Sequence, residues 1–180
     1  LFNKGKPHQI DIAAGTYSPS TTAESYPIKI SDRDISIRTD GNVTMDAEHK
    51  TSFFELTTAD INLVLRNFAF SNAHADSGGV VSCHSCTLRI VDNQFSGNVA
   101  NIGGDLVHMR GGKLNFSNNL MHNNGQLGHG AGLIKIDKET ADTSSSYSIR
   151  NNTFFNNNSV NIVTADDHVD VSNNIFSGGI

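Results

Sequence analysis

The stretch Leu88-Arg-Ile-Val-Asp-Asn-Gln-Phe95 decides the fold of this chain, because variants of it recur along the sequence. Apolar and polar residues alternate through its first half, an Asp-Asn or Asn-Asn pair usually follows, and a large apolar residue closes it. Successive copies start 25, 26, 33 and 22 residues apart. A repeat of this length predicts a solenoid, in which each unit buries its apolar face against its neighbours. The copies are Leu63–Phe70, Leu88–Phe95, Leu114–Met121, Tyr147–Phe154 and Val169–Phe176.

Each copy predicts a β-strand that ends at a sharp corner. Alternation of period two is typical of strands rather than helices. An Asn pair suits a corner, because Asn tolerates left-handed backbone angles and hydrogen-bonds its own turn. Stacked at one corner of successive coils, the amides can bond to one another as a ladder. We expect this ladder to begin one coil after Phe68 and to contain Asn93, Asn119, Asn152 and Asn174.

A second strand is expected before each copy. The segments are Phe54–Thr58, Val80–Cys83, Leu106–Met109, Leu133–Ile136 and Asn161–Thr164. Their alignment predicts one buried column of Leu56, Val81, Val107, Ile134 and Ile162, and a second inward column of Thr58, Cys83, Met109, Ile136 and Thr164. Glycines at 78–79, 103–104 and 130–132 supply the backbone freedom that a tight corner needs.

Weaker copies at Ile35–Asn42 and Ile10–Tyr17 extend the register backward, so about seven coils account for nearly the whole chain. Two strands and an Asn corner per coil predict an all-β fold, a right-handed parallel β-helix. We expect one domain over residues 1–180 that is part of a longer protein, with 137–146 as a protruding loop. Because bare solenoid ends invite pairing, we expect caps or further domains at both ends.

The chain resembles the pectin-lyase-like superfamily. Three segments of this chain, Ile10–Tyr17, Pro27–Ile30 and Ile35–Ile37, are similar to the entry coils of that fold. The middle resembles the repeats of chlamydial polymorphic outer membrane proteins, which pair an FxxN motif with GGA(I/L/V). The matching segments are Phe95–Asn98 before Gly103–Val107, Phe116–Asn119 before Gly130–Ile134, and Phe155–Asn158, with Asp105 in place of the Ala. The low charge and the abundance of Asn, Ser, Thr and Gly are typical of an extracellular or cell-surface scaffold.

Composition excludes several classes of function. The net charge is −5 and the 13 Lys and Arg residues do not cluster, which argues against nucleic-acid binding. No run approaches the roughly 20 apolar residues of a membrane span. For Cys83-His-Ser-Cys86 three interpretations stay open: buried packing, a local disulfide and catalysis. A structural zinc site needs four ligands, so we expect neither a metal nor a cofactor.

The candidate binding residues lie in two outward columns. The first is Thr57, Ser82, His108, Lys135 and Val163, and the second is Ala59, His84, Arg110, Asp137 and Ala165. The central coils therefore predict one titratable cluster of His84, His108, Arg110, Lys135 and Asp137. This cluster is either a solvated face, a binding patch for an acidic or hydroxylated glycan, or a catalytic site. Weaker candidates are His122, His129, Asp166-Asp167-His168, and the loop acids Asp137, Glu139 and Asp142.

Two functions from different classes remain. The first is a non-enzymatic scaffold or adhesin-type passenger segment that binds a glycan or a surface protein. The second is a carbohydrate-active enzyme, a polysaccharide lyase or glycoside hydrolase. The resemblance implies that a lyase would use a basic residue beside a uronate whose carboxylate is neutralised by calcium or cationic side chains. The central face offers one acid, Asp137, and not the clustered Asp residues that would hold calcium, which favours the scaffold.

Overall fold

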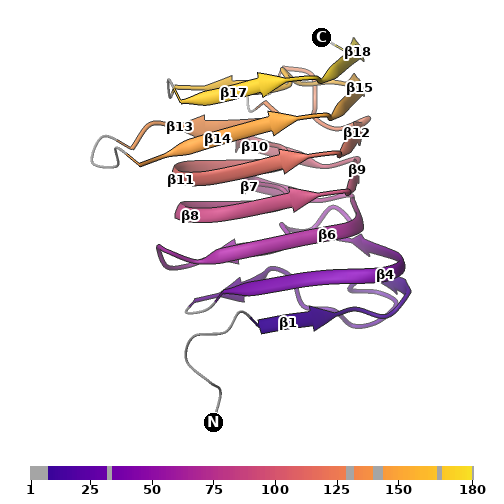
Figure 1. The fold of residues 1–180 in the computed structure, drawn as a ribbon. Helices are drawn as coiled ribbons and strands as arrows, with labels where there is room; N and C mark the ends of the chain where they lie inside the picture. The colour runs from indigo at the N-terminus through magenta and orange to yellow at the C-terminus, as the bar shows by residue number, and fades with distance from the viewer. Residues whose placement is uncertain (1–7, 32–33, 129–131, 140–143, 166–167, 180) are drawn as a thin grey trace.

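In the computed structural model, which describes residues 8–31, 34–128, 132–139, 144–165 and 168–179, the chain forms a parallel β-solenoid (Figure 1). It has about six turns, close to the seven coils that the repeat predicts. Among the described residues no helix is long and apolar enough to cross a membrane. The strands, in chain order, are β1 His8–Asp11, β2 Gly15–Tyr17, β3 Ile28–Ile30, β4 Ile35–Asp46, β5 Phe54–Leu56, β6 Asn62–Ser71, β7 His74–Ser77, β8 Val81–Val91, β9 Gln94–Ser96, β10 Val99–Gly103, β11 Val107–Ser117, β12 Leu120–His122, β13 Ile134–Asp137, β14 Ser146–Arg150, β15 Thr153–Asn157, β16 Ile162–Thr164, β17 Val169–Ser172 and β18 Ile175–Gly179.

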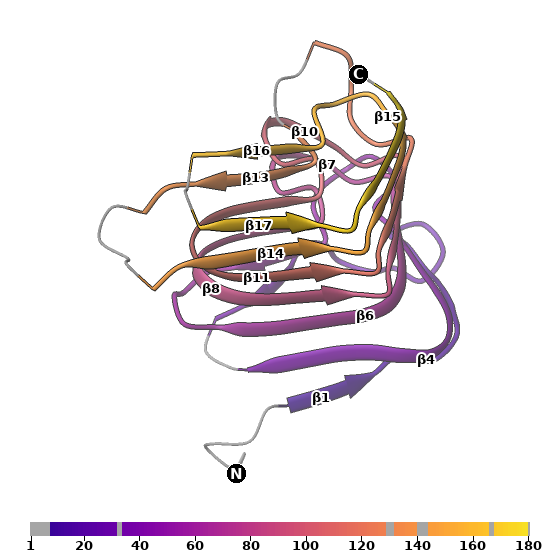
Figure 2. The same ribbon diagram turned by 45° about the horizontal axis from the view of Figure 1, so that its top comes forward.

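Each central coil has three faces, one more than the sequence predicted (Figure 2). The first face contains the first halves of β8 and β11, which pair with each other, followed by β13 beside β11 and β16 beside β13. Their second halves pair with β6, β14 and β17, and form the second face. The short strands β9, β12, β15 and β18 form the third. Thus β8 and β11 each bend through a corner. The corresponding path of the next coil is divided into β13 and β14 by residues 138–145, of which 140–143 lie outside the described residues.

The repeat register is confirmed along the second face. Five copies align in one column, Leu63, Leu88, Leu114, Tyr147 and Val169. Ile35 aligns with Leu63 as predicted, but Ile10 pairs with Ile37 and not with Ile35. This slip of two residues leaves the same side chains on each face, because side chains in a strand alternate with period two.

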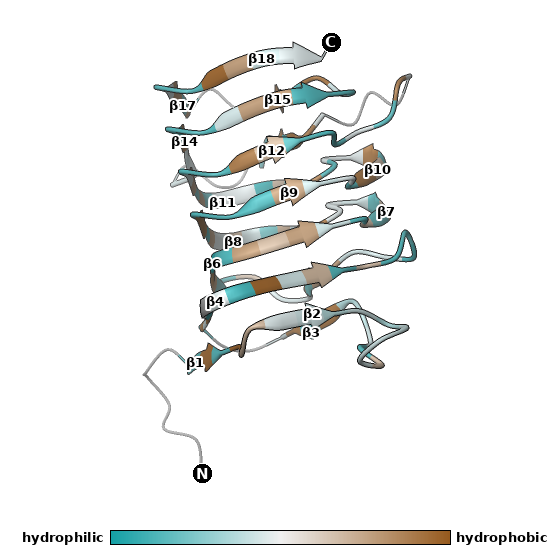
Figure 3. Cartoon of the chain, turned by 90° about the vertical axis from the view of Figure 1, so that its right-hand side faces the viewer, coloured by the Kyte–Doolittle hydropathy of each residue, from teal (hydrophilic) through white to brown (hydrophobic). Residues whose placement is uncertain are grey.

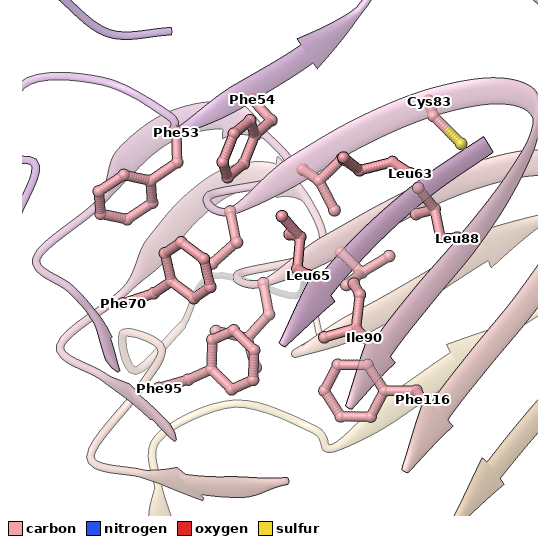
Figure 4. Packing of buried hydrophobic residues seen from close by; sticks show 14 of the residues in the cluster. Phe53, Phe54, Leu63, Leu65, Phe70, Cys83, Leu88, Ile90, Phe95 and Phe116 are labelled. Atoms are coloured by element: carbon pink, nitrogen blue, oxygen red, sulfur yellow. The ribbon is translucent and has the colours of Figure 1, made fainter. Parts of the chain in front are cut away.

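The core is a continuous stack of apolar side chains between the faces (Figure 4). Val81, Val107 and Ile134 are completely buried and lie in one column, as predicted, while Ile162 in the last coil is only partly buried. Phe70 and Phe95 stack with ring centroids 5.6 Å apart. Such stacking adds to the stabilisation that each ring gains from burial.

The predicted start of the first inward column is wrong by two residues. Phe54, not Leu56, pairs with Val81. Leu56 remains buried, but Thr58, which was expected to face inward, is exposed. The slip also changes the outward column, because Glu55 rather than Thr57 lies beside Ser82.

The structure contains the expected asparagine ladder. Backbone N–H and side-chain amide groups of Asn93 donate to Oδ1 of Asn119, which repeats the pattern with Asn152, and Asn152 repeats it with Asn174. Phe68 begins the row, since its backbone N–H donates to Oδ1 of Asn93. Each rung pairs backbone groups that the corner would otherwise bury without partners.

A second ladder, absent from the sequence-based predictions, lies at the next corner. Asn98 donates to Oδ1 of Asn124, and Asn124 donates to Oδ1 of Asn157. All three side chains are buried. Each follows by three residues an inward residue of the third face, so the structural motif begins at Phe95, Met121 and Phe154. The motifs that were read from Phe116 and Phe155 do not share this register.

A disulfide closes the corner between the first and second faces, and a glycine allows the corner before the first face. Cys83 and Cys86 form a disulfide, with Cα atoms 6.1 Å apart, so the local disulfide is the interpretation that the structure supports. Gly104 has φ of +55°, and a Cβ there would lie 1.9 Å from the carbonyl oxygen of Val107. This corner therefore requires glycine, as the sequence predicted.

Candidate functional site

The first face brings the five predicted titratable residues onto three adjacent strands. On β8, β11 and β13, register pairs place Arg110 between His84 and Asp137. Two residues earlier on the same strands, His108 lies between Ser82 and Lys135. Because inward residues such as Val107 occupy the alternate positions and are completely buried, these side chains face outward. We call this surface the first-face cluster.

The His108 imidazole is hydrogen-bonded to an acid of the neighbouring coil. Its Nε2 lies 2.8 Å from Oδ2 of Asp137, and the two side chains are 22% and 40% exposed. Such a carboxylate holds an imidazole in one orientation. His108 can therefore donate or accept a proton at a fixed position on this face.

Glu139 belongs to the same surface, although the sequence did not predict its contacts. Its Oε2 lies 3.0 Å from Nε2 of His84 and 3.2 Å from Nε of Arg110. The Glu139 side chain is only 16% exposed, whereas His84 and Arg110 are 63% and 60% exposed. A Cβ on Gly111 would lie 3.0 Å from Cβ of Glu139, so the glycine makes room for this side chain. Glu139 therefore holds the start of the 138–145 connection against β8 and β11.

The remaining cations on this face also have partners. Lys135 Nζ donates to the carbonyl oxygen of Ile102 at 3.0 Å and so ties β13 to β10. Lys29 lies 3.3 Å from Glu55, the residue beside Ser82. Each of the acids Glu55, Asp137 and Glu139 thus lies beside a basic side chain of this face.

Two depressions adjoin the outward side of β8. One, of about 570 Å³, lies beside Ser82 and is walled by β7 and by Asn101 of β10. The other, of about 730 Å³, lies beside His84 and is lined by Lys113, Glu139 and Ser144 among others. Both are polar and shallow, so they suit the side groups of an extended ligand better than a small molecule that must be enclosed.

The other candidates do not join this cluster. His122 lies on β12, in the third face, and His168 is exposed just before β17. His129, Asp142, Asp166 and Asp167 lie outside the described residues. Within the described part of the chain no three His, Cys, Asp or Glu side chains are grouped as a metal site would require.

Comparison with protein-family profiles, curated proteins and solved structures finds no significant match to the chain.

Proposed function

We propose that the chain is a segment of an extracellular or cell-surface β-solenoid scaffold that binds a glycan or a partner surface through the first-face cluster. In this proposal the solenoid is of the pectin-lyase-like kind, and its repeats are related to those of chlamydial polymorphic outer membrane proteins. The observation that carries the proposal is the rigid alignment of His84, Arg110 and Asp137 on adjacent parallel strands.

Three features support a binding scaffold. The strands that carry the cluster are anchored by a fully buried core, so the backbone positions of its side chains are fixed before a ligand binds. The Arg110 side chain is 60% exposed and its Nε lies 3.2 Å from Oε2 of Glu139, so its guanidinium is accessible to a ligand. The Cys83–Cys86 disulfide is consistent with an oxidising compartment outside the cytosol.

A carbohydrate-active enzyme is the second candidate, and the His108–Asp137 pair favours it. A histidine oriented by a carboxylate is a competent proton acceptor, and the depression beside Ser82 could receive a sugar. The acids of the face, however, are each bonded to a basic side chain of the same face. His108 is the proton acceptor in this candidate.

The test is a binding screen against glycan arrays and cell surfaces, run beside a lyase assay that follows the unsaturated product. Arg110→Ala combined with Lys135→Ala should weaken binding at least tenfold. The matched control is Arg66→Ala combined with Arg150→Ala, which removes the same charge from the second face, where these residues pair with Asp92 and Asp170. Equal binding by both double variants would remove the first-face cluster as the site.

The enzyme candidate has its own variant. In this candidate His108 is the proton acceptor, so His108→Ala should abolish turnover. Unsaturated product that is released by the wild type and lost in His108→Ala would replace the scaffold with a lyase.

A further inference from the structure

The third face carries an exposed aromatic side chain that the fold does not require. Phe155 of β15 points outward, in a column with Ser96, His122 and Ser177. It is 50% exposed although strands β12 and β18 lie on both sides of it (Figure 3). The same outward position on β9 and β18 is occupied by the small side chains of Ser96 and Ser177, so the strand does not need an aromatic residue there. Phe155 is therefore not explained by packing.

The surroundings of Phe155 form a narrow, uncharged strip. We define the third-face strip as the eight outward residues of β9, β12, β15 and β18. None of these eight described residues is an acid, a lysine or an arginine. This distinguishes the strip from the first-face cluster and from the net charge of −5 of the whole chain. The strip consists of Gln94, Ser96, Leu120, His122, Thr153, Phe155, Ile175 and Ser177.

Exposed amides border the strip on both sides. Asn118 and Asn151 lie at the corner before it, and Asn123 and Asn156 lie at the corner after it. Their positive φ angles explain why asparagine occupies these corners. The Asn118 side chain donates to Oδ1 of Asp92 at 3.2 Å, and the four exposed amides retain further donor and acceptor capacity for a ligand. Asn156 donates to Oδ1 of Asn123 at 2.8 Å, which orders one border. Along the other border, a depression of about 450 Å³ runs beside Leu120, Thr153 and Asn118. Its lining includes one acid, Asp92, whose charge is paired with Arg66.

The size of the strip decides what can cover it. Four strands about 4.8 Å apart give the strip a length of about 14 Å, and two outward residues per strand give it a width of about 7 Å. The second halves of β6 and β4 continue this face beyond β9. The projected area is therefore about 100 Å², whereas a stable protein partner buries about 800 Å² on each side. A slender chain that lies along the strip can cover this area completely.

We propose that the third-face strip binds a neutral carbohydrate chain. A sugar ring has apolar C–H faces and hydroxyl groups around its edge. The faces match the Phe155 ring and the Leu120 side chain, and the hydroxyls match the bordering amides of Asn118, Asn151, Asn123 and Asn156. The strip lies on a different face from Arg110 and Lys135, so this inference does not depend on the function proposed for the first-face cluster.

Affinity electrophoresis through gels that contain soluble polysaccharides tests the inference. The probes are the neutral polymers hydroxyethyl cellulose, xylan, glucomannan and dextran, with polygalacturonate as the acidic comparison. Wild-type protein should be retarded by at least one neutral polymer. Phe155→Ala should weaken the retardation at least tenfold, and Phe155→Tyr should restore most of it, because an aromatic face is retained. Ile102→Ala is the matched control, since Ile102 is 67% exposed on β10, away from the strip.

Each outcome decides the point. The double variant Arg110→Ala, Lys135→Ala should keep the full neutral-polymer retardation, which separates this site from the first-face cluster. No retardation by any neutral polymer would overturn the inference, as would equal retardation of wild type and Phe155→Ala. Retardation by polygalacturonate alone would also overturn it. Unchanged thermal melts in Phe155→Ala and Phe155→Tyr would show that the variants differ in binding and not in folding. A changed sedimentation coefficient in Phe155→Ala would reassign the strip to self-association.

Discussion

Asn119 makes two hydrogen bonds to a single acceptor of the next coil, because its backbone N–H and its side-chain amide both donate to Oδ1 of Asn152, at 2.9 and 3.2 Å. Its own Oδ1 receives the same two groups of Asn93. The side-chain amide also donates to the carbonyl oxygen of Ile90. One buried side chain thus pairs groups in the coils on both sides of it.

Asn119→Ala should therefore lower the free energy of unfolding by about 1–3 kcal/mol, because the backbone N–H of Asn93 and the carbonyl of Ile90 lose buried partners. Urea denaturation followed by circular dichroism measures this change. Asn115→Ala is the control, since Asn115 is exposed on β11 and should change stability by less than about 0.5 kcal/mol. Equal midpoints for the two variants would mean that the ladder contributes no net stability.

The strand register and the first ladder were predictable because a local repeat encodes them. The alternation in Leu88–Phe95 defines the strand, and the Asn pair defines the corner. The same period-two alternation cannot detect a slip of two residues, since both registers bury the same side chains. For this reason Leu56 was placed beside Val81, and Glu55 was missed on the first-face cluster.

Contacts made by loops and by the third face could not be read from the repeat. Glu139 reaches His84 across a sequence separation of 55, and only Gly111 on the facing strand hints at the space it needs. The second ladder did leave a signal, because Asn98, Asn124 and Asn157 follow Phe95, Met121 and Phe154 at a constant spacing. A search for the FxxN motif misses this spacing, because Met121 occupies the core position that Phe95 and Phe154 occupy in the neighbouring coils.

Val107→Asp should abolish soluble folding. Val107 is completely buried between Val81 and Ile134, where an ionised carboxylate has neither water nor a counter-ion. The measurement is the soluble fraction after expression, with Asn115→Asp on the outward side of the same strand as the control. A soluble Val107→Asp protein with a normal melt would contradict the inward assignment of this column.

Reduction of the Cys83–Cys86 disulfide should lower stability by about 2 kcal/mol, the loss expected from the chain-entropy relation for so short a loop. Urea denaturation with and without dithiothreitol measures it, and alkylation followed by mass spectrometry counts the free thiols. The Cys83→Ala, Cys86→Ala variant should not respond to dithiothreitol. Two free thiols in the untreated protein would contradict the disulfide.

Glu48 should make the solenoid less stable in acid. Lys50 Nζ lies 2.6 Å from its Oε2, and Ser20 and Ser18 donate to Oε1; these contacts lower the pKa of Glu48 from 4.5 to about 2. Because the pKa is depressed in the folded state, the stabilisation is fully present above pH 4.5 and is lost as the pH falls toward 2. Melting temperatures of wild type and Glu48→Gln should therefore differ at pH 6 and converge near pH 2. A difference that stays constant with pH would show that the carboxylate charge is not responsible.

Glu139→Ala should increase the affinity of the first-face cluster for anionic polymers. Glu139 is the counter-ion of Arg110 and is also hydrogen-bonded to His84. Its removal leaves the Arg110 guanidinium without this carboxylate, on a side chain that is 60% exposed. Retardation in polygalacturonate gels should rise severalfold, and the gain should shrink as salt is added, because exposed charges are screened. Glu55→Ala is the matched control, since it removes the same charge from the same face and frees Lys29 instead. A gain in Glu139→Ala that disappears when Arg110→Ala is added, and that Glu55→Ala does not reproduce, assigns anion recognition to Arg110. Equal gains in both single variants would mean that only the net charge of the face had changed.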